Sequence, residues 1–196
     1  MKLYLAYGAN TNLSHMKVRC PQAKYVCNIT LNHHHLVFRG VADVIPVRGG
    51  RVECAMWLIT PKDEEALDRF EGFPSFYVKK YVRVRIKDRW SRVMLYVMRN
   101  QKDRAQSEGY GSYVETLRAG YRDCGLPLTQ IDRAQQRVKE WERAKGWTQR
   151  SEKFHPRWNK RPVEVAEEDL FTEDKEGENQ SELAAEEFFR SLRNAY

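Results

Sequence analysis

Glu71 is the residue of this chain whose position first suggests chemistry. It ends the stretch ALDRFE, for which Thr60 as N-cap, Pro61 in the first turn and Gly72 after the last residue predict a helix over 61–71. Glu71 follows Leu67 by four residues, so its carboxylate falls on or beside the apolar stripe of that helix. Spacing alone leaves two interpretations: a frayed last turn that bends into water, or a partly buried carboxylate with a raised pKa that serves as a general acid/base.

Histidine and cysteine provide weaker signals. His33 and His35 share a face if residues 33–35 are a strand, but no cysteine or carboxylate pattern completes a metal site, so we expect no metal. The four cysteines form no CxxC pair, which gives no support to a zinc ribbon or a thioredoxin-type motif. Scattered cysteines are typical of reduced proteins, and the absence of a long apolar run or a signal-peptide pattern predicts a cytoplasmic protein without membrane contact.

The elements that must position these residues alternate between short strands and isolated helices. Strands are predicted at 2–8, 24–31, 35–40, 51–60, 76–90 and 91–98, with a turn at 46–50, and helices at 13–21, 61–71, 108–124 and 129–145. Ser107 is the expected N-cap of the third helix. This pattern predicts an α+β fold with a strongly curved or closed sheet.

Five short motifs in order carry a family resemblance. They are YGAN at 7–10, RCP at 19–21, LDRFEG at 67–72, SEGY at 107–110 and GLP at 125–127. Together they resemble the γ-glutamylcyclotransferase-like (AIG2-like, γ-glutamylamine cyclotransferase-like) family of bacterial type, over about residues 1–130. The resemblance implies a small mixed, β-barrel-like sheet with flanking helices in a domain at 1–145. Residues 146–196 would then form a charged C-terminal extension.

The resemblance also implies an activity and a site. Glu71 corresponds to the catalytic glutamate, and the substrate-binding residues would be Tyr7, Gly8, Ala9, Asn10 and Tyr110. Such an enzyme releases 5-oxoproline from a γ-glutamyl amide by attack of the substrate's own α-amine, without a cofactor. From spacing alone the preferred interpretation of Tyr110 is a core aromatic of its helix. The chain departs from the family pattern at Ala9, where serine is usual, and at Gln106, where proline is usual.

Charge supports two alternatives to an enzyme. The chain carries +7, and because residues 151–196 hold 12 acidic and 7 basic residues, the first 150 residues carry +12. A nucleic acid is therefore an alternative partner, and its predicted surface is a basic aromatic strand face made of Tyr77, Lys79, Tyr81, Arg83 and Arg85. A protein that kept the cavity and sequesters a small ligand without turnover is the second alternative. We also expect a short helix from Ser181 to dock on the basic body or on a second copy in a homodimer.

Overall fold

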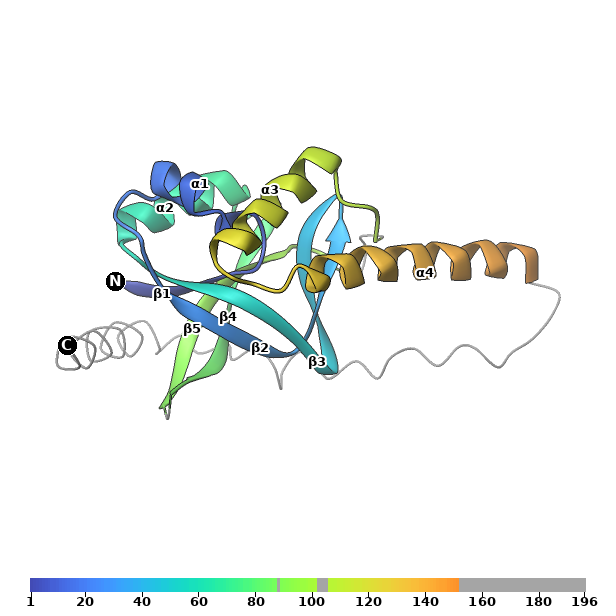
Figure 1. The fold of residues 1–196 in the computed structure, drawn as a ribbon, viewed down its shortest axis with the longest axis horizontal. Coiled ribbons are helices and arrows are strands. Elements are labelled where there is room, and N and C mark those ends of the chain that lie inside the picture. Colours follow the sequence, from blue (N-terminus) through green and yellow to red (C-terminus); the bar gives the residue numbers. More distant parts are fainter. Residues whose placement is uncertain (88, 102–105, 152–196) are drawn as a thin grey trace.

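A five-stranded mixed sheet organises the described part of the chain. The computed structural model describes residues 1–87, 89–101 and 106–151. Its strands are β1 (Lys2–Ala6), β2 (Lys24–Arg39), β3 (Val41–Ile59), β4 (Tyr77–Ile86) and β5 (Arg89–Met98). They lie in the order β2-β3-β1-β5-β4, with β1 antiparallel to β3 and parallel to β5 (Figure 1). The predicted α+β class is confirmed. The sheet of the described residues is not closed into a barrel, because its two edge strands, β2 and β4, do not pair with each other.

The long β2–β3 hairpin differs from the prediction. Residues 24–31 and 35–40 belong to one strand, and the chain reverses at Gly40, whose φ of 81° is accessible to glycine at little cost. The segment 46–50 is therefore not the turn that reverses the chain. The register passes from the Asn32–Arg51 pair to the His34–Pro46 pair, so residues 47–50 bulge out of β3.

The helix that presents Glu71 has the predicted bounds. In α2 (Pro61–Glu71), Thr60 and Asp63 form a capping box, and Gly72 ends the helix in the left-handed conformation with φ 63°. Before it come η1 (Ala9–Thr11) and α1 (Leu13–Arg19), and Asn12 caps α1 by accepting a hydrogen bond from His15 N. η1 and α1 follow the C-terminal end of β1, whereas α2 begins beside its N-terminal end, because Lys2 pairs with Ile59.

The later helices differ from their predicted bounds. Helix α3 (Gly111–Asp123) has Tyr110 as its N-cap, and Ser107 is not the cap. Ser107 N donates to Phe38 O and Tyr110 N to Gly40 O, which holds the segment before α3 against the end of the β2–β3 hairpin. Helix α4 (Thr129–Ser151) continues through Gly146, because one interior glycine costs only about 1 kcal/mol and does not end a helix.

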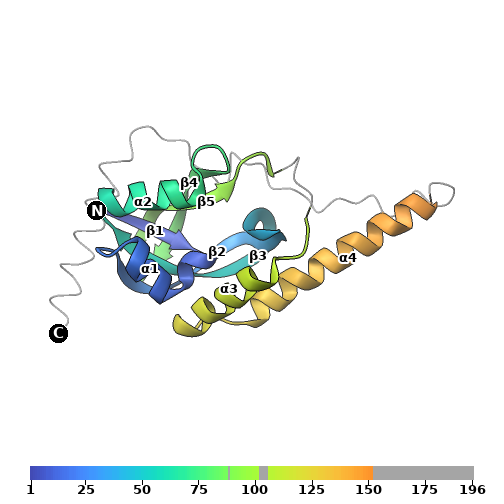
Figure 2. The ribbon, with the colours of Figure 1, turned by 90° about the horizontal axis from the view of Figure 1, so that it is seen from above.

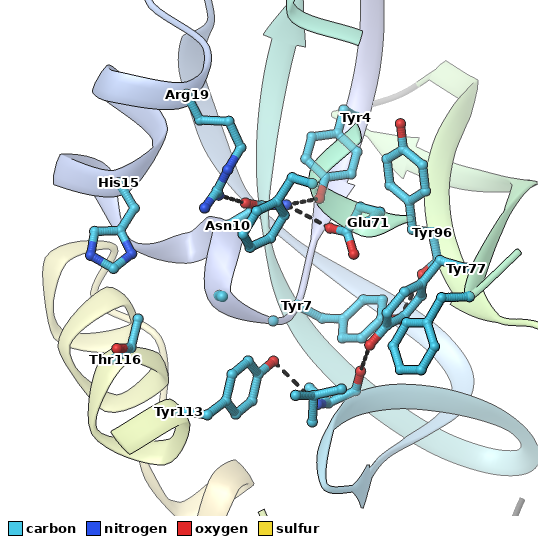
Figure 3. A pocket seen from close by; sticks show the side chains of 16 residues that line it. Tyr4, Tyr7, Asn10, His15, Arg19, Glu71, Tyr77, Tyr96, Tyr113 and Thr116 are labelled. Atoms are coloured by element: carbon cyan, nitrogen blue, oxygen red, sulfur yellow. Dashed lines mark hydrogen bonds between the residues drawn. The ribbon is translucent and has the colours of Figure 1, made fainter. Parts of the chain in front are cut away.

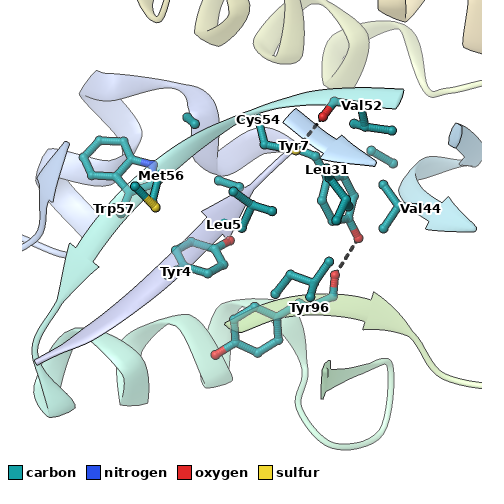
Figure 4. Packing of buried hydrophobic residues seen from close by; sticks show 14 of the residues in the cluster. Tyr4, Leu5, Tyr7, Leu31, Val44, Val52, Cys54, Met56, Trp57 and Tyr96 are labelled. Carbon is teal, nitrogen blue, oxygen red and sulfur yellow. Dashed lines mark hydrogen bonds between the residues drawn. The ribbon is translucent and has the colours of Figure 1, made fainter. Parts of the chain in front are cut away.

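Apolar side chains from all five strands and from α1 to α4 form the core. Leu5, Leu31, Val52 and Met56 are almost fully buried and meet in the cluster drawn in Figure 4. Gly120 of α3 allows that helix to approach η1, since a Cβ there would lie 2.4 Å from Thr11 Oγ1. The core thereby fixes β1, η1 and α3 relative to one another.

Two further observations concern the remainder of the chain. Figure 2 shows α4 extending away from the sheet and the other helices. Within the described residues, no helix is both long enough and apolar enough to cross a membrane. The predicted terminal helix, its acidic neighbourhood and the docking of this extension lie outside the described residues. The domain boundary at 145 stays a prediction.

Candidate active site

A cavity of about 350 Å³ lies where the end of β1, the last turn of α2 and the first turn of α3 meet. Five tyrosines line it: Tyr4, Tyr7, Tyr77, Tyr96 and Tyr113. Figure 3 shows Glu71 among these rings, with Arg19 and Asn10 beside it. The cavity is thus mainly aromatic, with one carboxylate and one guanidinium on its wall.

The Glu71 carboxylate points into this cavity. A general acid/base at this position requires that orientation. Its Oε1 accepts a hydrogen bond from Asn10 Nδ2 at 2.8 Å, and within the described residues its second oxygen makes no hydrogen bond. Burial raises the pKa of Glu71 to about 7, while the Arg19 charge and the Asn10 hydrogen bond oppose this rise. A carboxyl group with such a pKa can both accept and donate a proton near neutral pH.

Asn10 connects the charged groups of the cavity. Its Nδ2 donates to Glu71 and also to the Tyr4 hydroxyl at 2.9 Å, while its Oδ1 accepts a short hydrogen bond from Arg19. The Arg19 guanidinium lies over the Phe70 ring, 3.2 Å from the ring centroid. Cation–π packing and the amide hydrogen bond together hold the guanidinium at the cavity wall.

The loop Tyr7–Asn10 lines the cavity with all four of its residues, as predicted. Tyr7 is buried, and its hydroxyl donates to Tyr96 O at 2.6 Å. A Cβ on Gly8 would lie 3.0 Å from the Tyr113 hydroxyl, which explains a glycine at this close approach. The Tyr113 hydroxyl therefore lies directly against this loop.

Tyr110 lies outside the cavity, contrary to the prediction for this residue. Its side chain is 68 % exposed, and its ring packs beside Gly40. Tyr113, one helical turn later, lines the cavity in its place. The difference follows from the start of α3: because Gly111 is its first residue, Tyr110 caps the helix and only Tyr113 projects from its first turn toward Gly8.

Ala42 of β3 fixes two of the tyrosines that sequence reasoning missed as cavity residues. Tyr77 Oη donates to Ala42 O at 2.6 Å, and Ala42 N donates to Tyr113 Oη at 3.2 Å. Tyr96 Oη donates to Asp68 Oδ1 at 2.6 Å. No sequence motif groups Ala42 with these rings, and Arg19 belongs to the RCP motif but was given no role in the site from the sequence.

The alternative surfaces are partly engaged in internal contacts. On the predicted nucleic-acid face, Tyr77 is buried and Lys79 forms ion pairs with Glu64 and Asp68. His33 Nδ1 accepts from Gly49 N at 3.2 Å. Within the described residues, no three His, Cys, Asp or Glu side chains are grouped to hold a metal ion.

Comparison with known proteins then decides the family. Residues 4–115 match the family model described as gamma-glutamyl cyclotransferase, AIG2-like. The chain belongs to this family. The match spans more than half of the chain and includes β1, α2 and the first residues of α3, which together build the cavity.

Solved structures show the same fold at low identity. A structure named gamma-glutamyl cyclotransferase aligns with a TM-score of 0.58 and 24 % identity, over 70 % of this chain and 86 % of that one. An uncharacterized protein from Homo sapiens aligns with a TM-score of 0.57 and 24 % identity over the same shares. YkqA from Bacillus subtilis aligns at 0.58 and 19 % identity, over 70 % of this chain and 54 % of that one. A search of curated proteins finds no match.

Proposed function

We propose that this protein is a cyclotransferase that releases 5-oxoproline from a γ-glutamyl amide, with Glu71 as the general acid/base. The observation that carries the proposal is the Glu71 carboxylate, which faces an aromatic cavity and has a pKa of about 7. The family match supports a reaction of this class. The substrate is a small molecule, and the reaction requires no cofactor because its nucleophile is part of the substrate.

The reaction is balanced within one substrate molecule. The α-amino nitrogen attacks the γ-carbonyl carbon and closes a five-membered ring, while the amine proton moves to Glu71. The same carboxyl group then protonates the leaving nitrogen, and the γ-amide C–N bond breaks to give 5-oxoproline and a free amine. Since Asn10 holds Oε1, the second carboxylate oxygen is the one that exchanges protons with substrate.

The shape of the cavity would provide much of the rate acceleration. Folding a γ-glutamyl chain so that its amine faces its own carbonyl has an entropic cost, which a cavity of about 350 Å³ lined by rigid rings can offset on binding. Four of the five cavity tyrosine hydroxyls are bonded to backbone or carboxylate groups, and that of Tyr4 to the Asn10 amide, so the walls keep their shape. A low-dielectric wall also keeps the Glu71 pKa near neutrality.

A panel of γ-glutamyl amino acids, amines and isopeptides, with released 5-oxoproline measured by mass spectrometry, tests this function. Glu71→Gln is expected to reduce turnover by at least about 100-fold, the usual contribution of a general acid/base. Glu65→Gln, on the exposed side of the same helix, is the matched control and should retain activity. Unchanged turnover in Glu71→Gln would remove Glu71 from the mechanism.

The two alternatives give different results in the same experiments. A sequestering protein would bind a panel member and return it unconverted. A nucleic-acid-binding protein would bind oligonucleotides with an affinity that falls steeply with salt. Tyr77 and Lys79 have internal partners. Arg92 also lies over the Tyr81 ring, and Arg85 Nε donates to Lys87 O, so these side chains of the predicted face would have to rearrange to contact such a ligand.

A further inference from the structure

The hydroxyl groups of the cavity tyrosines differ in whether they donate their proton to an acceptor within the protein. Tyr7 donates its proton to Tyr96 O, Tyr77 to Ala42 O and Tyr96 to Asp68, each at 2.6 Å. These three hydroxyls are therefore directed to fixed acceptors of the protein. They support the wall of the cavity, and their protons do not reach a ligand.

The Tyr4 hydroxyl is different because it acts as an acceptor. Arg19 has only donors, so the Asn10 atom beside it must be the carbonyl oxygen, and the amide nitrogen must face Tyr4 and Glu71. Tyr4 Oη consequently accepts from Asn10 Nδ2, and its own proton points elsewhere. Within the described residues, this hydroxyl makes no other hydrogen bond, although the side chain is only 3 % exposed and lines the cavity.

The Tyr4 hydroxyl also has a fixed position. Its ring packs edge-to-face against Tyr96, with centroids 5.8 Å apart and an interplanar angle of 75°. Burial and the nearby Glu71 raise the pKa of Tyr4 well above its usual value, so the phenol keeps its proton at neutral pH. A buried, oriented and protonated donor that faces a cavity is suited to an oxygen that gains negative charge.

We propose that Tyr4 Oη–H donates a hydrogen bond to the γ-carbonyl oxygen of the substrate as this oxygen becomes an oxyanion. This assignment rests on the proposed function. The carbonyl oxygen, the attacking nitrogen and the leaving nitrogen are all bonded to one carbon in the tetrahedral intermediate. The base and the oxyanion donor must therefore be neighbours, and one amide nitrogen, Asn10 Nδ2, bonds both Glu71 and Tyr4, at 2.8 Å and 2.9 Å.

Tyr113 is the rival donor, since its hydroxyl also accepts a backbone N–H, that of Ala42. Figure 3 shows it across the turn at Tyr7 from the Asn10–Glu71 pair. Within the described residues, the Tyr113 hydroxyl and Glu71 have no hydrogen-bond partner in common. Tyr113 is therefore not held next to the base in the way that Asn10 holds Tyr4. A contact from Tyr113 to a more distant substrate oxygen would affect binding more than the chemical step.

Tyr4→Phe, which removes one oxygen atom, tests the proposal. We expect kcat for 5-oxoproline release to fall about 100-fold, as when one oxyanion donor is removed. KM should stay within about threefold, and the acidic limb of the pH–rate profile should not move. Tyr121→Phe is the control: it also removes a buried tyrosine hydroxyl, one bonded to Gln130 and Tyr7 O, and should lower stability while kcat is retained.

Three results would overturn the role of Tyr4. They are a kcat within about threefold of wild type, a loss explained entirely by a shifted acidic limb, and a loss confined to KM. If Tyr4→Phe does not fold, the test is instead the carbonyl stretching frequency of labelled 5-oxoproline bound to wild type. A frequency like that of 5-oxoproline in an apolar solvent would contradict a hydrogen bond from Tyr4 to this carbonyl. If wild type releases no 5-oxoproline, the proposed function fails, and this result is separate from the test of Tyr4. In that case 5-oxoproline binding to wild type and to Tyr4→Phe is compared, and equal binding, or no binding to either protein, would overturn the role of Tyr4 as well.

Discussion

Replacing Glu71 by Gln is expected to stabilise the protein at alkaline pH, although it removes the proposed catalytic group. The unfolded chain holds this carboxyl at a pKa of 4.5, whereas burial in the folded protein raises it to about 7. Below pH 4.5 both states carry a neutral carboxyl, and the folded state has no buried charge to stabilise. Between pH 4.5 and about 7 the unfolded chain loses this proton while the folded protein keeps it, so stability falls as pH rises, and above about 7 both states are ionised and the loss is complete.

The size of this effect follows from the difference between the two pKa values. A difference of about 2.5 corresponds to roughly 3 kcal/mol of unfolding free energy, fully lost above the folded pKa. Glutamine keeps the oxygen that accepts from Asn10 and has no charge to bury. The variant should therefore be about 3 kcal/mol more stable than wild type at pH 8.5, and within about 1 kcal/mol of it at pH 4.5.

Urea denaturation of wild type and Glu71→Gln across this pH range measures the effect. The pH dependence of all other groups is common to both proteins and cancels in the difference between their unfolding free energies. Glu65→Gln, exposed on the same helix, should show no pH-dependent difference from wild type. A Glu71→Gln difference that is independent of pH, or a variant less stable than wild type at pH 8.5, would refute a buried carboxyl with a raised pKa.

Three further predictions concern the charge network, the loop and the extension. Arg19→Met removes the cation that lowers the Glu71 pKa, so the acidic limb of the kcat/KM pH profile should move up by roughly one pH unit. The control Arg122→Met, at an exposed position, should leave this acidic limb unchanged. Ala9→Ser adds a hydroxyl to the cavity wall and should fold normally with higher activity toward simple γ-glutamyl amides; an unchanged substrate profile would show that the departure is neutral. Deleting residues 152–196, which carry −5, should increase salt-sensitive binding to polyanions, and unchanged binding would contradict a screening role.

Local sequence signals predicted the elements around the catalytic glutamate because those signals act within a few residues. The Thr60–Asp63 capping box and the left-handed Gly72 define α2 without help from the rest of the chain. For α1 the sequence offered Asn12 or Ser14 as the cap, and the structure has Asn12. Signals at 46–50 and at Ser107 were misleading, since pairing of the long β2–β3 hairpin and hydrogen bonds to its end determine those backbones.

The family was therefore determined by the sequence itself, through short motifs in order, whereas helical spacing placed Glu71 on or beside an apolar face without deciding whether its carboxylate points inward. The tertiary structure decided the rest of the cavity. Tyr4, Arg19 and Tyr113 come from three different elements, and their distances from Glu71 depend on how β1, α1 and α3 pack. Tyr110 and Tyr113 have the same side chain one helical turn apart, and only the packing of α3 on η1 selects the one that faces the cavity.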